Sequence, residues 1–206
     1  MSRLVNNLIK DGYLRTDRII DAFSEISRIE FVPKEFELQA EADVALPIGY
    51  GQTISQPLTV ALMFELLDPQ EDQKILDVGS GSGWTTALLS YIVGEKGKVI
   101  AIERKEELKK IGERNVDKFK YVKNNRARFF SGDGSLGFPQ EAPFDRILVS
   151  AETENIPEEL KKQLKIGGKM VLPAGNSIWY LEKKNETEFI KEEYGGFSFV
   201  PLVINQ

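Results

Sequence analysis

The stretch Lys74-Ile75-Leu76-Asp77-Val78-Gly79-Ser80-Gly81-Ser82-Gly83 decides the fold of this chain. Its first half is a short apolar run of the kind that forms a buried strand, and its second half is a glycine-rich turn. Helical spacing of apolar residues begins directly afterwards, at Trp84. A strand, a glycine-rich turn and a helix in this order place backbone N–H groups and a helix N-terminus against a ligand.

The spacing of the glycines favours a nucleoside over a pyrophosphate as that ligand. A dinucleotide fingerprint that starts at Gly79 needs glycine at position 84, which is Trp84, and one that starts at Gly81 needs it at position 86, which is Thr86. No Gly-Lys-Ser/Thr sequence follows that would make a P-loop. The turn alone is also compatible with a tight strand-to-helix connection that binds nothing.

Strand and helix patterns alternate after this stretch. The strands are predicted at residues 75–78, 99–102, 127–130, 147–150 and 170–172, and the helices at residues 84–93, 106–119 and 157–164. This alternation is typical of βαβ units and predicts an α/β, Rossmann-like, mostly parallel sheet flanked by helices. Residues 178–204 carry two or three strand patterns without a helix between them, which predicts an antiparallel C-terminal hairpin.

The chain before this stretch has another pattern. Helical spacing is found at residues 4–9, at 16–23 with Thr16 as an N-cap, and at 59–67, and a strand pattern near residues 44–48 leads into a turn. We therefore expect one domain over residues 1–206. In it, residues 1–58 form a helical extension with a loop that covers the ligands, and residues 59–206 form the Rossmann-like core.

Two acidic residues end neighbouring predicted strands. Glu103 lies 20 residues after Gly83, where a carboxylate can accept hydrogen bonds from both hydroxyls of a ribose. Asp133 lies between Gly132 and Gly134, where it can accept from an exocyclic amine such as adenine N6. Each is also compatible with an ordinary strand end or an Asp-Gly turn. With the glycine turn, they favour an adenosine-type ligand at the carboxyl edge of the sheet.

The composition excludes several classes of chemistry. The 206 residues include no Cys and no His, so disulfides, thiolate metal sites, cysteine nucleophiles and a histidine base are absent. The net charge of −5 disfavours nucleic acid as a partner. No apolar run approaches the ~20 residues of a membrane span, and no secretory signal is visible. We expect a cytoplasmic monomer that uses no metal and contacts no membrane.

These features resemble the Class I S-adenosylmethionine-dependent methyltransferases. The run Leu46-Pro47-Ile48-Gly49-Tyr50-Gly51-Gln52-Thr53-Ile54-Ser55-Gln56-Pro57 narrows the resemblance, because it is similar to the signature of the protein-L-isoaspartate O-methyltransferases. Further similar pieces are Phe31-Val32-Pro33, Ile102-Glu103-Arg104, Gly132-Asp133-Gly134, Ala142-Pro143-Phe144-Asp145-Arg146-Ile147, Leu164-Lys165-Ile166-Gly167-Gly168 and Phe199-Val200-Pro201-Leu202. The resemblance covers the chain from about Arg28 to Val203.

The resemblance implies an activity and a set of site residues. The implied cofactor is S-adenosylmethionine, and the implied partners are isoaspartyl-containing proteins and peptides, whose methyl ester closes to a succinimide and reopens partly to Asp. Ser55 falls on the catalytic serine. The implied cofactor-binding residues are Asp77, Gly79, Ser80, Gly81, Gly83, Glu103, Arg104, Gly132, Asp133 and Gly134. The implied substrate-binding residues are Thr53, Ile54, Ser55, Val149 and Ser150.

The residue chemistry agrees with this implied reaction. A carboxylate acceptor has a pKa near ~4, so it is already ionised at neutral pH and needs no general base. We hypothesise that the Ser55 hydroxyl binds one oxygen of the acceptor and aims the other at the methyl group. The competing interpretation of Ser55 is a cap of the helix that follows Pro57. For Asp77, we favour a structural carboxylate that accepts from the N–H groups of the glycine turn.

One segment departs from the family pattern. Where the family usually has small residues near the acceptor, this chain has Glu152 and Glu154, which would repel a carboxylate if they faced it. We expect both side chains to point to solvent. The alternatives are the same fold acting on another carboxylate, such as Asp of a dedicated partner peptide, or on a small molecule. An RNA methyltransferase and a non-catalytic binding protein are disfavoured by the charge and by the intact motifs.

Overall fold

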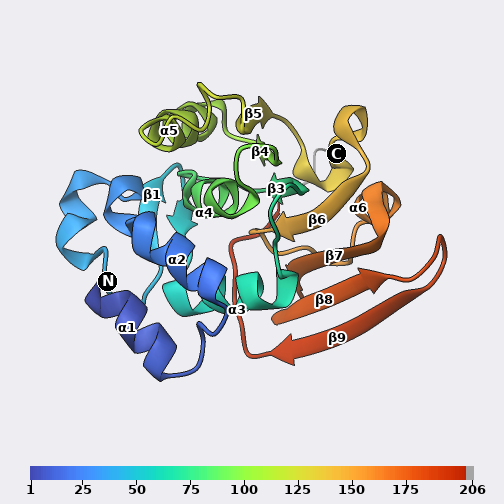
Figure 1. Ribbon diagram of the computed structural model, residues 1–206, viewed down its shortest axis with the longest axis horizontal. Coiled ribbons are helices and arrows are strands. Elements are labelled where there is room, and N and C mark those ends of the chain that lie inside the picture. Colours follow the sequence, from blue (N-terminus) through green and yellow to red (C-terminus); the bar gives the residue numbers. More distant parts are fainter. Residues whose placement is uncertain (203–206) are drawn as a thin grey trace.

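A seven-stranded sheet organises the part of the chain that the computed structural model describes, residues 1–202 (Figure 1). Its strand order is β5-β4-β3-β6-β7-β8-β9. The strands are β3 (Lys74–Val78), β4 (Lys98–Glu103), β5 (Ala127–Ser131), β6 (Phe144–Val149), β7 (Leu164–Ala174), β8 (Ser177–Lys183) and β9 (Phe189–Gly195). Neighbours from β5 to β7 pair in parallel, and β7, β8 and β9 pair antiparallel. The predicted fold class and the C-terminal hairpin are confirmed.

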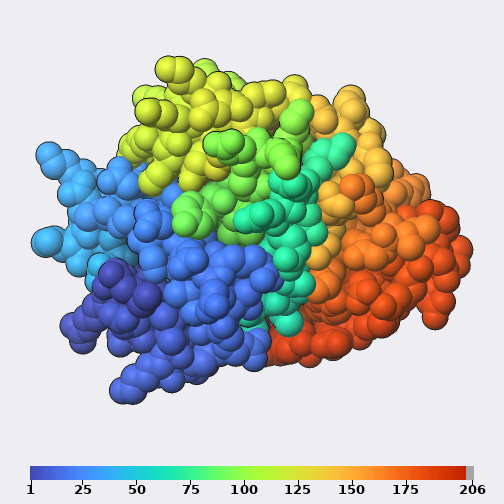
Figure 2. All heavy atoms as spheres, viewed as in Figure 1, coloured from blue at the N-terminus to red at the C-terminus, as the bar shows by residue number. Residues whose placement is uncertain are grey.

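Helices cover both faces of the sheet. They are α1 (Arg3–Lys10), α2 (Asp17–Glu25), α3 (Pro57–Leu67), α4 (Trp84–Val93), α5 (Glu106–Asp117) and α6 (Glu158–Gln163). Short 3₁₀ turns are η1 (Arg28–Phe31), η2 (Lys34–Gln39), η3 (Gly134–Leu136) and η4 (Pro139–Glu141). Side chains alternate along the strands, so that Ile75 packs under the layer of α1 to α5 while Leu76 packs with Leu160 of α6 on the other face. In the space-filling view, a teal stripe from α3 and the chain that follows it lies between most of the blue N-terminal region and the orange and red C-terminal region (Figure 2).

The N-terminal segment adds a separate small sheet. β1 (Leu46–Gly49) pairs antiparallel with β2 (Gln52–Ile54), and these two strands join no strand of the large sheet. Thr16 is the N-cap residue of α2, as predicted, but its hydroxyl accepts no hydrogen bond from the N–H groups of the helix and instead donates to Glu65 Oε2 of α3 at 2.8 Å. The Thr16 side chain therefore serves to fix α2 against α3. The predicted strand pattern beyond residue 202 lies outside the described residues.

The strand order creates a crevice at the carboxyl edge. β3 lies at the centre of the five parallel strands, and the chain continues from it to β4 on one side and returns later to β6 on the other. Loops that leave neighbouring parallel strands in opposite directions open a gap between them, which is where open α/β sheets bind ligands. The glycine turn after β3, Glu103 at the end of β4 and Ser150 after β6 all lie at this gap.

Candidate active site

The glycine turn between β3 and α4 has a backbone conformation that requires glycine. Gly79, Gly81 and Gly83 have φ of 78°, 53° and 93°, in the left-handed region that a Cβ atom disfavours. The N–H groups of Gly79 and Ser80 donate to Ile102 O at 2.9 and 3.1 Å, which ties the turn to β4. The first two glycines therefore bring bare backbone to the crevice.

Gly83 has a different task from Gly79 and Gly81. A Cβ atom at Gly83 would lie 2.8 Å from Gly112 O and 2.8 Å from Val116 Cγ2 of α5. Gly83 lines none of the hollows of the site. The structure thus places this predicted cofactor residue at the close contact between α4 and α5, which it makes possible.

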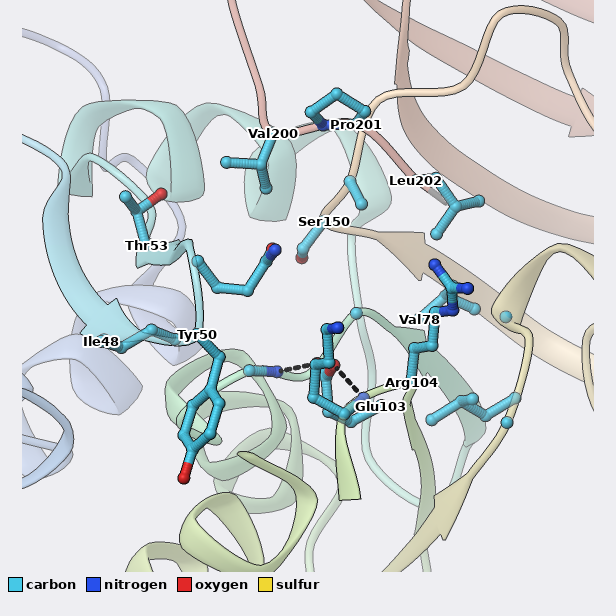
Figure 3. A pocket seen from close by; sticks show the side chains of 18 residues that line it. Ile48, Tyr50, Thr53, Val78, Glu103, Arg104, Ser150, Val200, Pro201 and Leu202 are labelled. Atoms are coloured by element: carbon cyan, nitrogen blue, oxygen red, sulfur yellow. Dashed lines mark hydrogen bonds between the residues drawn. The ribbon is translucent and has the colours of Figure 1, made fainter. Parts of the chain in front are cut away.

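Glu103 is held in place by backbone donors. Its Oε2 accepts from Gly81 N at 2.9 Å and its Oε1 accepts from Lys105 N at 3.0 Å (Figure 3). The residue is 7% exposed and lines the crevice. Each carboxylate oxygen can accept a further hydrogen bond. The predicted diol acceptor is therefore present in a fixed orientation.

Asp133 caps the 3₁₀ turn η3. Its Oδ1 accepts from Ser135 N at 3.0 Å and from the Ser135 hydroxyl at 2.7 Å. Gly132 and Gly134, on either side of it, line the crevice. A Cβ atom at Gly134 would lie 2.3 Å from Val78 Cγ1, so this turn can pack against β3 only with glycine. Asp133 thus holds the shape of the wall to which its neighbours contribute.

Asp77 is buried beneath the turn and does not use it as expected. Its Oδ2 accepts from the hydroxyls of Thr85 and Thr86 at 2.8 and 2.6 Å, and not from N–H groups of the turn. The reason is that three amides of the turn already donate to β4 and Glu103. Burial raises the pKa of Asp77 to about 6, against the lowering effect of the two threonine hydroxyls. Its Oδ1 has no hydrogen-bond partner in residues 1–202.

A pocket of about 210 Å³ lies above these residues (Figure 3). We call it the cofactor pocket. Its lining comprises Ile48, Tyr50, Gln52, Thr53, Val78, Gly79, Gly81, Ile102, Glu103, Arg104, Lys105, Gly132, Gly134, Ser150, Ala151, Val200, Pro201 and Leu202. In Figure 3, Val200, Pro201 and Leu202 lie on one side and Glu103 lies across the hollow from them. Segments from all parts of the described chain thus enclose one pocket.

A second hollow, of about 580 Å³, adjoins the first. We call it the acceptor groove. It is lined by Ala45, Thr53, Ser55, Gln56, Leu58, Thr59, Ser150, Gly196, Phe197, Ser198, Phe199 and Val200, none of which is charged. Thr53, Ser150 and Val200 line both hollows and so mark their junction. A narrow space of about 30 Å³ between Ser55 and the glycine turn connects them further.

Only some of the predicted substrate residues line the acceptor groove. Thr53, Ser55 and Ser150 line the acceptor groove. Ile54 is buried and lines only the narrow connecting space. Val149 is fully buried, and its side chain packs in the core with Leu76 and Ile147. Because side chains alternate along β6, Val149 faces the core and the next residue, Ser150, reaches the site.

The remaining predicted cofactor residues divide in the same way. Arg104 lines the cofactor pocket. The Ser80 hydroxyl is buried and has no hydrogen-bond partner in residues 1–202, and Ser80 lines only the narrow connecting space.

Sequence reasoning missed several residues of the pocket walls. They are Ile48, Tyr50, Gln52, Val78, Ile102, Lys105, Ala151, Val200, Pro201 and Leu202. Most are apolar or carry no distinctive chemistry, and most are far from the glycine turn in sequence. The Phe199-Val200-Pro201-Leu202 piece of the family resemblance was the available signal for the last three.

The two glutamates after β6 do not face the acceptor groove. Glu152 Oε1 accepts from Asn176 N at 2.9 Å, in the turn between β7 and β8, and the Glu152 backbone pairs with Val200 and Leu202. Glu154 is exposed and lines neither hollow. The repulsion that these carboxylates would exert on an anionic acceptor is therefore avoided, although Glu152 is engaged with a turn and not simply solvated.

The chain is similar to known proteins over its whole length. Residues 1–206 match the family described as Protein-L-isoaspartate(D-aspartate) O-methyltransferase. A curated relative from Methanopyrus kandleri, named Protein-L-isoaspartate O-methyltransferase, is 44% identical over 98% of this chain and 90% of its own.

Two solved structures of that name have the same fold. One has a TM-score of 0.85 and 30% identity, and this chain covers 64% of its length, so this chain is the shorter of the two. The other, from Plasmodium falciparum in complex with S-adenosyl-L-homocysteine, has a TM-score of 0.84 and 24% identity over 98% of this chain.

Proposed function

This chain belongs to the protein-L-isoaspartate(D-aspartate) O-methyltransferase family, and we propose that it carries out the family reaction at the junction of the cofactor pocket and the acceptor groove. The reaction is the transfer of a methyl group from S-adenosylmethionine to the α-carboxylate of an L-isoaspartyl residue in a damaged protein or peptide. The observation that carries the proposal is the shared wall of Thr53, Ser150 and Val200 between the two hollows.

The cofactor pocket fits S-adenosylmethionine. Side chains on Gly79 or Gly81 would stand in the turn at the pocket wall, where a Cβ of Gly81 would come within 3.2 Å of Ile48 Cδ1. Glu103 supplies the acceptor that a ribose diol requires, and at Gly132 in the pocket wall no atom lies within 4 Å of where a Cβ atom would stand. These residues would hold the nucleoside end. The sulfonium group supplies an activated methyl group, which is the difficult part of the chemistry.

The acceptor groove suits an anionic group that needs no proton transfer. An isoaspartyl α-carboxylate is ionised at neutral pH, so the protein has to position it and exclude water. The neutral lining of the groove does not repel it. In residues 1–202 no hydrogen-bond partner is recorded for the Ser55 hydroxyl, which is therefore available to donate to a carboxylate oxygen. No observation in this part of the chain favours another acceptor.

The first experiment compares two peptides. Methyl transfer from labelled S-adenosylmethionine is measured with a short peptide that contains one L-isoaspartate and with the matched Asp peptide. We expect a base-labile methyl ester on the isoaspartyl peptide alone. Labelling of the Asp peptide, or of neither peptide by a protein that still binds the cofactor, would contradict the proposed acceptor.

The role of Ser55 is tested by Ser55→Ala. Removing a hydrogen bond that aligns a reacting group costs up to about 100-fold in turnover. We expect kcat for the isoaspartyl peptide to fall by about 100-fold while the Kd of S-adenosylhomocysteine changes by less than about twofold. Equal losses in both quantities would contradict the assignment. The control is Thr59→Ala, which removes another hydroxyl that lines the groove.

The proposal also includes the setting of the reaction. We propose that residues 1–206 act as one catalytic unit, as a monomer, in the cytoplasm. No helix within residues 1–202 has the length and apolarity that crossing a bilayer requires. Sedimentation of the purified protein would test the monomer.

A further inference from the structure

A buried guanidinium lies behind the acceptor groove. Arg28, in η1, is 4% exposed. Its Nη1 donates to Ala40 O at 3.0 Å and to Ala42 O at 3.2 Å. Its Nη2 donates to Val44 O at 2.8 Å and to Ser55 O at 3.1 Å. One side chain thus joins the loop of residues 40–44 to the backbone of the residue that lines the groove.

Burying the Arg28 guanidinium costs free energy, and its hydrogen bonds go to four particular carbonyls. No carboxylate forms an ion pair with Arg28 in residues 1–202, and burial lowers its pKa to about 10, which still leaves it charged at neutral pH. The Trp84 ring lies 5.4 Å from the guanidinium carbon and closes it off from the other side. Both Nη groups donate only to carbonyls, Nε has no hydrogen-bond partner in residues 1–202, and Asp43 attracts the charge through space. This buried charge fixes the four carbonyls strongly, because moving any of them away leaves more of the charge unpaired in the interior.

A second contact holds the far side of Ser55. Asp43, in the loop that Arg28 binds, accepts from Leu58 N at 2.8 Å through Oδ1 and from Gln56 Nε2 at 3.0 Å through Oδ2. Leu58 lies in the first turn of α3, where backbone N–H groups lack partners within the helix. Ser55 is therefore fixed by its own carbonyl on one side and by the start of α3 on the other.

We propose that Arg28 is a positioning residue for methyl transfer, which acts through the backbone of Ser55 and the loop of residues 40–44 to fix the Ser55 hydroxyl in the acceptor groove. This inference rests on the proposed function. Its physical basis is that a hydroxyl aligns an acceptor well only if its own backbone does not move, and a misplacement of about 1 Å can cost about 100-fold in rate.

The test compares Arg28→Lys with Arg146→Lys. Arg146 is also buried and also donates to backbone carbonyls, Asp68 O at 3.1 Å and Asp145 O at 2.9 Å, but neither of these two residues lines the cofactor pocket or the acceptor groove. We expect Arg28→Lys to lower kcat for the isoaspartyl peptide by about 10–100-fold with an unchanged Kd for S-adenosylhomocysteine. Arg146→Lys should change kcat by less than about threefold at an equal loss of melting temperature.

A double-mutant cycle separates positioning from general damage. If Arg28 acts through Ser55, adding Arg28→Lys to Ser55→Ala should lower kcat by less than about threefold further. Losses that multiply would overturn the proposal. A fully active Ser55→Ala variant would overturn it as well, together with the role of Ser55.

Hydrogen exchange gives a readout that does not depend on methylation. Arg28→Lys should speed amide exchange in residues 55–58 and leave β3 unchanged, whereas Arg146→Lys should not affect residues 55–58. Unchanged amide exchange in residues 55–58 would overturn the positioning role of Arg28 even if activity falls. If Arg28→Lys speeds this exchange but the parent protein methylates no isoaspartyl peptide, the result would support Arg28 as the residue that fixes Ser55 and would contradict the proposed function.

Discussion

The two halves of the site are built in different ways. The cofactor pocket rests on the ends of three adjacent parallel strands, and its polar parts include backbone groups of the glycine turn, the buried carboxylate of Glu103 and polar side chains such as Gln52 and Thr53. The acceptor groove is assembled from loops on both sides of β1 and β2 and from residues 196–200 near the other end of the described chain. Its geometry depends on a few long-range side-chain contacts, those of Arg28 and Asp43.

This difference separates binding from turnover. The sheet and the helices packed on it fix the cofactor pocket, so that damage there should reduce stability or cofactor affinity. The acceptor groove lies on segments that the sheet does not contain, so that damage there should lower turnover and spare cofactor binding. The following changes test that separation, from the largest expected effect to the smallest.

The largest effect is expected from Gly83→Ala. The new Cβ would lie 2.8 Å from Gly112 O at a φ of 93°, so it adds a clash with backbone to conformational strain. We expect a loss of roughly 3 kcal/mol of unfolding free energy, measured by denaturant titration. Gly175→Ala is the control, because Gly175 has a φ of 59° with no atom within 4 Å of the new Cβ. Equal losses in the two variants would show that the packing of α4 on α5 is loose.

Asp77→Asn should stabilise the protein in a pH-dependent manner. Because the pKa of Asp77 is raised from 3.8 to about 6 by burial, the folded state binds this proton more tightly than the unfolded state. The resulting stability is present below pH 3.8 and is lost as the pH rises through 6. Asn carries no charge, so its advantage should grow over this window to at most about 3 kcal/mol at pH 8.

Thermal unfolding at pH 5 and pH 8 measures this difference. Asp72→Asn, at an exposed carboxylate, is the control. If the difference in stability between Asp77→Asn and the parent does not change with pH, the ionisation of Asp77 is not the cause of that difference.

Glu103→Gln should weaken cofactor binding and leave turnover intact. A hydrogen bond to a charged group contributes about 1.5–3 kcal/mol, which corresponds to roughly 10–100-fold in Kd. Calorimetric titration with S-adenosylhomocysteine measures it, while kcat at saturating donor should stay within about threefold. The expectation is the reverse of that for Ser55→Ala, which should lower kcat and leave cofactor affinity unchanged. A large fall in kcat with unchanged affinity would contradict the division of the site. Glu106→Gln, in the exposed first turn of α5, is the control.

The smallest effect is expected from Glu154→Gln. Glu154 is exposed and lines neither hollow, so kcat/KM for the isoaspartyl peptide should change by less than about twofold. A gain of tenfold or more in steady-state assays would show that this carboxylate repels the acceptor after all, and that the groove extends past Ser150.

The same division explains what the sequence could predict. The glycine turn, Glu103 and the alternation of strands and helices are local patterns with a direct physical meaning, so the sheet and the cofactor edge follow from them. The helix at residues 84–93 was predicted with the boundaries that α4 has. The acceptor groove came only from the resemblance, because Ser55, Phe197 and Val200 show no periodicity or spacing that links them.

Two errors have specific causes. Val149 and Ser150 are neighbours in sequence but face opposite ways, and only the end of β6 decides which one reaches the site. Asp77 was given the wrong partners because hydrogen bonds from the turn to β4, which no sequence pattern reports, had already used the amides of the glycine turn. Arg28 drew no prediction, since nothing in the sequence around a single arginine identifies the groups to which it donates.

The central position of β3 also governs how the protein is made. β3 forms its ladders with β4, which follows soon after it, and with β6, which begins only at Phe144. During synthesis, β3 therefore leaves the ribosome long before β6, the strand that pairs with its second edge. Non-local pairings form slowly, and unpaired apolar strands are exposed to aggregation in the meantime. The strand order that opens the ligand crevice thus leaves β3 of the nascent chain paired on one edge only until β6 has been synthesised.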